Sequence, residues 1–242
     1  MSNTNASEKR QALDFLAKDF LTFAPMIEAL DKNDAALISV HDFGVAMKHK
    51  EGIVLIGVAD DDATLHFKDR ICDGGLNVVY GNTDPDYIIN NIPNIIRAVP
   101  CHQVVYTKKS PPKLKMNIEY RLMDAGFIDF FYDNYSRSWD KAHMRILLER
   151  EFIFGAYVGG EIIGFIGRHM DGSMGFLEIL PKFRRQGYGK ELENFIIGRV
   201  MSEGRIPFAH IVMGNEVSMS LQGKVEGLDF AKKLATWVRV KT

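Results

Sequence analysis

Hydrophobic residues recur with helical spacing near the start of the chain. Leu13, Leu16, Ala17, Phe20 and Leu21 stand at i, i+3, i+4, i+7 and i+8, a spacing that places side chains on one face of an α-helix. Apolar runs then predict strands at 53–58, 77–80 and 102–107, with a helix over 86–98. The first half is therefore predicted to be mixed α/β.

The second half alternates between strand-like and helix-like patterns in a regular order. The paired glycines Gly159 and Gly160 lie between two apolar runs, a strong signal for a β-hairpin. The other predicted strands are 118–122, 173–180, 208–213 and a final strand pair within 228–240, and the predicted helices are 125–135, 138–151, 187–204 and 216–225. Strands with inserted helices predict an α+β sheet covered on both faces.

A proline-containing basic segment separates the two halves. It reads KKSPPKLK over 108–115, and its prolines can neither continue a helix nor occupy a central strand. We expect an exposed connector between an N-terminal α/β domain, 1–112, and a second domain, 116–242.

Composition and charge exclude several classes of protein. Of the 242 residues, 46% are hydrophobic and 25% charged, with a net charge of −1, which is typical of a globular protein without a basic field for nucleic acid or an anionic membrane. Cys72, Cys101 and the seven histidines show no metal-ligand spacing, so no metal is expected. The first residues lack the apolar core of a signal peptide, which favours a cytoplasmic location.

The segment EILPKFRRQGYGKEL, 178–192, combines cations and glycines at a predicted strand-to-helix junction. The first N–H groups of a helix lack intrahelical partners and favour an anion, so this junction suits a phosphate. A dinucleotide fingerprint would need glycine where Leu192 stands, and a Walker loop would need a hydroxyl at Glu191. The alternative is a basic surface turn that binds nothing.

The pattern Arg184-x-x-Gly187-x-Gly189, preceded by Pro181-x-Phe183, resembles the acyl-CoA pyrophosphate loop of the GNAT (GCN-five-related) N-acetyltransferase superfamily. The strand and helix over 117–135, the hairpin over 155–167 and the N-x-x-S-x-x-L pattern from Asn215 to Leu221 resemble further family elements in family order. The resemblance covers 116–242, and 164–184 is most similar to the glycine N-acyltransferase-like branch. Several members of this branch carry a degenerate copy of the fold as their N-terminal half, so the resemblance implies that the first half here is such a copy, without a CoA loop.

The resemblance implies acetyl-CoA or another acyl-CoA as co-substrate, with pantetheine along one strand and the pyrophosphate on the loop. A backbone N–H near Ile179 would polarise the thioester carbonyl and hold the oxyanion. The implied CoA-binding residues are Leu177, Glu178, Ile179, Arg184, Arg185, Gln186, Gly187, Tyr188, Gly189, Lys190, Asn215 and Ser218.

The resemblance leaves the acid and base less well defined. The glutamate common at the start of the fourth strand is replaced by Ser173, and the alternative family position falls on His210, which we favour as general base over Glu178 and His169. The alternative is that His210 is a packed histidine with a structural role only. The tyrosine that usually protonates the thiolate is replaced by Gln222, which donates a hydrogen bond but no proton.

Together these features predict an N-acyltransferase, in first place an N-acetyltransferase, that acts on a primary amine of a small molecule by direct attack in a ternary complex. Two alternatives stay open: a non-catalytic acyl-CoA binding or regulatory module, and a protein N-acetyltransferase. A monomer and a homodimer are both compatible with the sequence.

Overall fold

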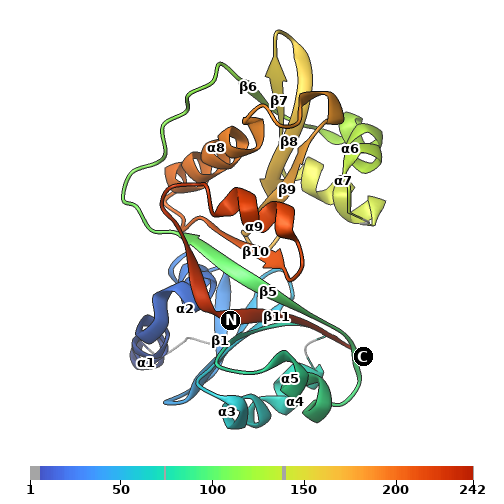
Figure 1. The fold of residues 1–242 in the computed structure, drawn as a ribbon. Coiled ribbons are helices and arrows are strands. Elements are labelled where there is room, and N and C mark those ends of the chain that lie inside the picture. Colours follow the sequence, from blue (N-terminus) through green and yellow to red (C-terminus); the bar gives the residue numbers. More distant parts are fainter. Residues whose placement is uncertain (1–5, 74, 138–139, 242) are drawn as a thin grey trace. The chain divides into compact units, whose positions relative to one another are not determined.

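The computed structural model describes residues 6–73, 75–137 and 140–241 (Figure 1). The chain forms two compact units that interleave along the sequence. The first unit contains 1–105, 210–215 and 229–242, and the second contains 106–209 and 216–228. The domain ranges 1–112 and 116–242 stay predictions; two segments of the second range, 210–215 and 229–242, belong to the first compact unit.

The first unit is built on a seven-stranded sheet in the order β1-β2-β3-β4-β11-β5-β10. Its strands are β1 (Ala35–His41), β2 (Gly44–His49), β3 (Val54–Val58), β4 (Leu76–Gly81), β5 (Ile95–Tyr106), β10 (Phe208–Val212) and β11 (Leu228–Val240). Its helices are α1 (Ala6–Leu16), η1 (Ala17–Asp19), α2 (Phe20–Asp31), α3 (Asp61–His66), α4 (Lys68–Asp73) and α5 (Pro85–Asn91).

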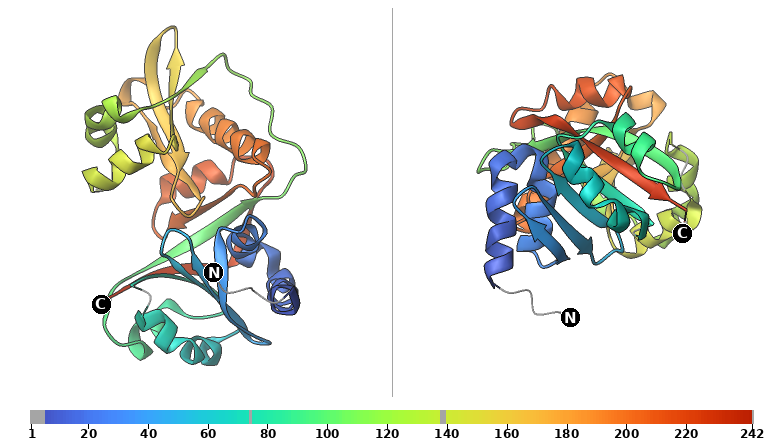
Figure 2. Two further views of the ribbon diagram at one scale, coloured as in Figure 1. Left: turned by 180° about the vertical axis from the view of Figure 1, so that it is seen from behind. Right: turned by 90° about the horizontal axis from the view of Figure 1, so that it is seen from below.

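Helices cover both faces of this sheet, as the views in Figure 2 show. On one face α1 and α2 bury Phe15, Leu16 and Met26 against β2, β3 and β4. On the other face α3, α4 and α5 bury residues such as Phe67 and Ile88 against alternate strand positions. All five residues of β3 are buried, as expected for a strand packed on both faces.

The strand pair β3 and β4 is parallel and stays hydrogen-bonded to its carboxyl end, where Val58 pairs with Gly81. Gly81 has a φ of +130°, and a Cβ there would lie 2.0 Å from the carbonyl oxygen of Val58. Glycine at position 81 therefore lets β3 and β4 stay paired up to their carboxyl ends.

The sequence predicted part of this unit correctly. The strands at 53–58 and 77–80 are confirmed. The helix predicted over 86–98 is wrong in its second half, because α5 ends at Asn91 and β5 begins at Ile95. Pro93 and Asn94, the latter with a φ of +61°, end the helix and turn the chain into the strand.

The second unit has a four-stranded antiparallel sheet in the order β6-β7-β8-β9. Its strands are β6 (Glu119–Leu122), β7 (Ile153–Val158), β8 (Glu161–Arg168) and β9 (Met174–Ile179). Its helices are η2 (Ala125–Phe127), α6 (Ile128–Asn134), α7 (Lys141–Glu149), η3 (Pro181–Phe183), α8 (Tyr188–Ser202) and α9 (Glu216–Gln222). Residues 138 and 139 of the predicted second helix lie outside the described residues.

Aromatic side chains fix helices to both faces of this smaller sheet (Figure 1). Phe131 of α6 contacts Phe165 of β8 and Phe176 of β9, at ring-centroid distances of 5.1 and 5.6 Å. On the opposite face Phe195 of α8 stacks on Tyr120 of β6 at 3.7 Å. The predicted two-sided coverage is therefore confirmed.

The C-terminal strand differs from its prediction. The expected strand pair within 228–240 is a single 13-residue strand, β11, whose residues Ala235 to Arg239 pair antiparallel with β4. The segment lacks glycine, proline or asparagine at its centre, so nothing in it favours a hairpin turn. Among the described helices, none is both long and apolar enough for a membrane span.

Candidate active site

The segment from β9 to α8 forms an uncapped, glycine-opened helix start. Arg185 and Gly187 have φ values of +62° and +88°, and Gly187 is the N-cap of α8 without a side-chain hydrogen bond to the first turn. The carbonyl of Gly187 accepts from the N–H groups of Lys190 and Glu191. The helix N-terminus therefore keeps the electrostatic character that favours an anion.

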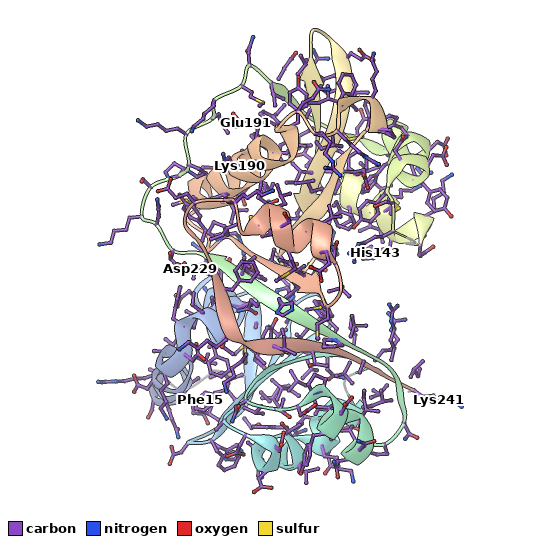
Figure 3. All side chains as sticks on the ribbon, in the orientation of Figure 1. Phe15, His143, Lys190, Glu191, Asp229 and Lys241 are labelled. Atoms are coloured by element: carbon purple, nitrogen blue, oxygen red, sulfur yellow. The ribbon has the colours of Figure 1, made fainter. Side chains whose placement is uncertain are left out.

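A cavity of about 200 Å³ lies beside this helix start, lined by Lys115, Met116, Gly187, Lys190, Glu191 and Asn194. The Glu191 carboxylate accepts hydrogen bonds from the backbone N–H groups of Lys115 and Met116, the second at 2.8 Å. Figure 3 labels Lys190 and Glu191 on α8. Glu191 thus holds Lys115 and Met116 in place as a wall of the cavity. Lys190 lines the same cavity and gives it a cation.

Arg184 uses its guanidinium within the protein. Its Nε donates to the carbonyl of Ile179 at 2.8 Å and its Nη2 to the Glu178 carboxylate at 3.2 Å. The other oxygen of Glu178 accepts from the backbone N–H of Ser136 at 3.1 Å. In this arrangement Arg184 braces the end of β9, and Glu178 ties that strand to the end of α6. Their roles toward CoA and catalysis stay predictions.

The predicted pantetheine strand, β9, is an edge strand of the second unit's sheet among the described residues. A bulge interrupts its pairing: Glu178 pairs with Phe165 and Gly175 with Gly167, so Phe176 and Leu177 oppose the single residue Ile166. Phe176 adopts a φ of +55° although it is a bulky residue. Such strain persists where the surrounding fold imposes it, often at functional sites. The bulge redirects β9 before Ile179.

The first turn of α8 contacts both β9 and α9. A Cβ on Gly189 would lie 3.7 Å from Leu221 and 4.0 Å from Ile179. The structure therefore brings the loop, Ile179 and the helix that carries Ser218 and Leu221 together in the second unit.

A buried acid–amide pair links α8 to α9 and was missed in the sequence. Gln222 donates from Nε2 to Glu193 Oε1 at 2.9 Å, and these residues are 5% and 2% exposed. Burial raises the pKa of Glu193 to about 7, although the hydrogen bond from Gln222 works in the opposite direction. The sequence pattern did not predict this pair, because helical spacing alone does not show that a glutamate faces another helix.

His210 and Asn215 belong to the first unit, whereas the loop belongs to the second. The His210 Nε2 lies 3.3 Å from Gln103 Oε1. The Gln103 amide nitrogen donates to the carbonyls of Leu21 and Thr22, so its oxygen faces the histidine and Nε2 is the donor. A proton-accepting His210 would therefore use Nδ1. Its ring also contacts Tyr80 and Trp237, which fits the alternative of a packed histidine.

The remaining candidates lie at the start of β9. Ser173 is buried and donates from N and Oγ to Asp171 Oδ1, at 3.1 and 2.6 Å. The ring of His169 packs on Phe176 at 4.2 Å. The carboxylate of Asp171, two residues before the expected glutamate position, is buried, which the local sequence pattern did not predict. Within 6–73, 75–137 and 140–241, no three His, Cys, Asp or Glu residues form a potential metal site.

Tyr135, at the end of α6, places a phenolic group near β9, with its ring 5.3 Å from that of Phe176. Burial raises the pKa of Tyr135 to about 12; the positive charge of Arg137 works in the opposite direction, and the Glu178 carboxylate raises the pKa further. A hydroxyl in this state remains protonated at neutral pH and acts as a hydrogen-bond donor.

Comparisons with known proteins found one matching family model and several solved structures with a similar fold. Residues 154–238 match the family described as FR47-like protein. No curated protein sequence matches the chain. A solved Drosophila protein aligns with a TM-score of 0.60 at 16% identity, covering 98% of this chain and 97% of that one.

Two structures with named families are also similar to this chain. An acetyltransferase from the GNAT family of Colwellia psychrerythraea has a TM-score of 0.52 at 14% identity, covering 95% of this chain and 97% of that one. A GCN5-related N-acetyltransferase-like protein from Streptococcus suis has a TM-score of 0.54 at 12% identity, covering 97% and 100%. The chain therefore has the GNAT fold, a mixed α+β arrangement with helices on both sheet faces, and carries an FR47-like segment over 154–238.

Proposed function

We propose that this chain is an acyl-CoA-dependent N-acyltransferase of the GNAT superfamily, most simply an N-acetyltransferase in the cytoplasm, acting on a primary amine of a small molecule. The observation that carries the proposal is the uncapped start of α8 at Gly187, with Lys190 lining the adjoining cavity. An anion there would receive both the helix dipole and an ammonium group. The glycine N-acyltransferase-like branch remains our preferred assignment within the superfamily.

The residues around β9 fit an acyl-CoA. When bound, acyl-CoA supplies an activated thioester for attack by the amine. The open edge of β9 offers backbone groups to pantetheine, and Arg184 holds Ile179 and Glu178 in place from the loop side. Because Arg184 is already engaged, we assign phosphate binding mainly to the α8 backbone and Lys190.

Proton transfer requires a base for the amine and a hydrogen-bond donor for the departing thiolate. The amine must lose a proton, and His210 remains our first choice of base, through Nδ1. Gln222 is held by Glu193, so any help it gives to the departing thiolate would be a hydrogen bond from its second amide hydrogen.

A non-catalytic acyl-CoA binding module is the second candidate. The observations that favour it are the contacts of His210 with Gln103 and the absence of an ionisable side chain at 222. Thiol release from acetyl-CoA, measured against a library of small amines and amino acids, separates the two. An amine-dependent release supports the enzyme. Saturable CoA binding without release for any amine or peptide would favour the binding module.

A further inference from the structure

A second concave site lies in the first unit, at the carboxyl ends of β3 and β4. Its volume is about 280 Å³, close to the lower end of the range of small-molecule sites, roughly 300 Å³. Phe15 and Phe23 form an apolar floor, since both are only 5% exposed and their rings lie 5.4 Å apart. Figure 3 labels Phe15 on α1. The site thus offers apolar surface for a small ligand.

Two ammonium groups from distant parts of the chain border this floor. Lys18 comes from η1, with its Nζ 5.3 Å from the centre of the Phe15 ring. Lys233 comes from β11 and donates to the side-chain oxygen of Asn82 at 2.5 Å. The insertion of β11 beside β4 therefore supplies the second cation.

The acidic residue in the lining, Asp19, has both carboxylate oxygens engaged in hydrogen bonds. Asp19 caps α2, because its two oxygens accept from the N–H and hydroxyl of Thr22 at 3.3 and 2.8 Å. The local balance of two lysines against one capping carboxylate favours an anion. Outside the lining, Asp60, Asp61 and Asp62 follow Ala59; Asp60 caps α3 through the N–H of Ala63, and Asp61 accepts from the Thr83 hydroxyl. Their negative charge opposes every anion, and it opposes a multiply charged phosphate more strongly than a monocarboxylate.

We propose that this pocket binds a small monocarboxylate with an apolar tail, its carboxylate between Lys18 and Lys233 and its tail on Phe15 and Phe23. The closed β3–β4 pair leaves no slot between these strands for an extended thioester. The site is separate from the proposed acyl-CoA loop, which belongs to the other unit.

The test is titration of the full-length protein with hexanoate, hexylamine and hexanol, without acyl-CoA, by calorimetry or ligand-observed NMR. Hexanoate should saturate a single site, and the amine and alcohol should bind at least about tenfold more weakly, the effect of one charge-assisted hydrogen bond. Lys233→Gln should weaken hexanoate binding by about tenfold. Ala59→Trp should abolish it by filling the pocket, since Ala59 is exposed and tolerates a larger side chain.

Lys232→Gln is the matched control. It makes the same change in net charge at the neighbouring residue of β11, which is exposed and points to the opposite face. The proposal is overturned if hexanoate shows no saturation by about 10 mM, if hexylamine or hexanol binds as well, or if Lys232→Gln weakens binding as much as Lys233→Gln. Displacement of hexanoate by CoA in the Gly187→Glu variant would also overturn it, as the pocket would then accept the larger thioester carrier. Each of these outcomes would leave the proposed acyl transfer unaffected, because that activity depends on the loop at Gly187.

Discussion

Gln222 of α9 donates its side-chain N–H to Glu193 of α8 across 2.9 Å, and both residues are buried. The pair connects the helix that starts at the glycine loop with the helix that carries Ser218. Because the acid has lost its water, its charged form is disfavoured.

Glu193→Gln should make stability less dependent on pH. Burial raises the pKa of Glu193 from its ordinary 4.5 to about 7, so the folded state holds the proton more tightly than the unfolded state. The stability this contributes is complete below pH 4.5 and is lost as pH rises toward 7, a difference of about 3 kcal/mol. The variant should therefore gain about that much over the wild type between pH 4.5 and 8.

Urea unfolding at several pH values measures this effect. Glu216→Gln, at the exposed start of α9, serves as the control and should follow the wild type. Parallel curves for wild type and Glu193→Gln would show that Glu193 does not titrate as inferred.

Gly187→Glu should abolish CoA binding while leaving the fold intact. The residue has a φ of +88° and a Cβ would approach Met116 Cε at 3.0 Å, a flexible neighbour. The strain of a left-handed residue is about 1–2 kcal/mol, which a folded domain tolerates, whereas the carboxylate would occupy the anion site. Calorimetry with CoA and a thermal melt test the two halves of this prediction.

Gly160→Glu is the matched control for backbone strain and charge. Gly160 has a φ of +82°, and none of the described heavy atoms lies within 4 Å of an added Cβ, so Glu there carries the same backbone penalty in the β7–β8 turn, outside the lining of the cavity beside α8. Equal CoA affinity in the two variants would refute the loop assignment.

Lys190→Gln should weaken CoA binding by about tenfold at low salt, because a charge-assisted contact to phosphate is lost. The difference from wild type should shrink as salt rises. Lys182→Gln is the control, because it removes the same charge from the same loop. Lys182 is paired with Glu161 at 2.8 Å, so the CoA affinity of this variant should equal that of the wild type. If Lys182→Gln had the larger effect, the cation of the site would have been misassigned.

His210→Ala should flatten the rise of the acyl-transfer rate with pH if His210 is the base. Gln103→Leu distinguishes the two ring nitrogens, because Nε2 faces Gln103. Loss of that contact should lower the rate modestly but keep the pH dependence, provided that Nδ1 accepts the proton. An unaltered profile in His210→Ala would leave His210 as a packed residue of the first unit.

Local pattern was enough to predict several elements and the chemical character of the loop. Apolar runs predicted β7, β8 and β9, and paired glycines predicted the hairpin between the first two. These features depend on neighbours within a few residues, so the sequence carries them directly. The short helices α3 and α4 were not predicted, since neither is long enough for a clear period.

The pairing of distant segments was decided only by the tertiary structure. The sequence of 228–240 predicts extended chain, but the edge it pairs with, β4 at Leu76–Gly81, lies more than a hundred residues earlier. Strand patterns specify which side chains are buried and do not specify the partner strand. The same holds for Glu193 with Gln222, for Arg184 with Glu178 and for the pocket between Lys18 and Lys233. Each depends on contacts between elements that packing, and not local spacing, brings together.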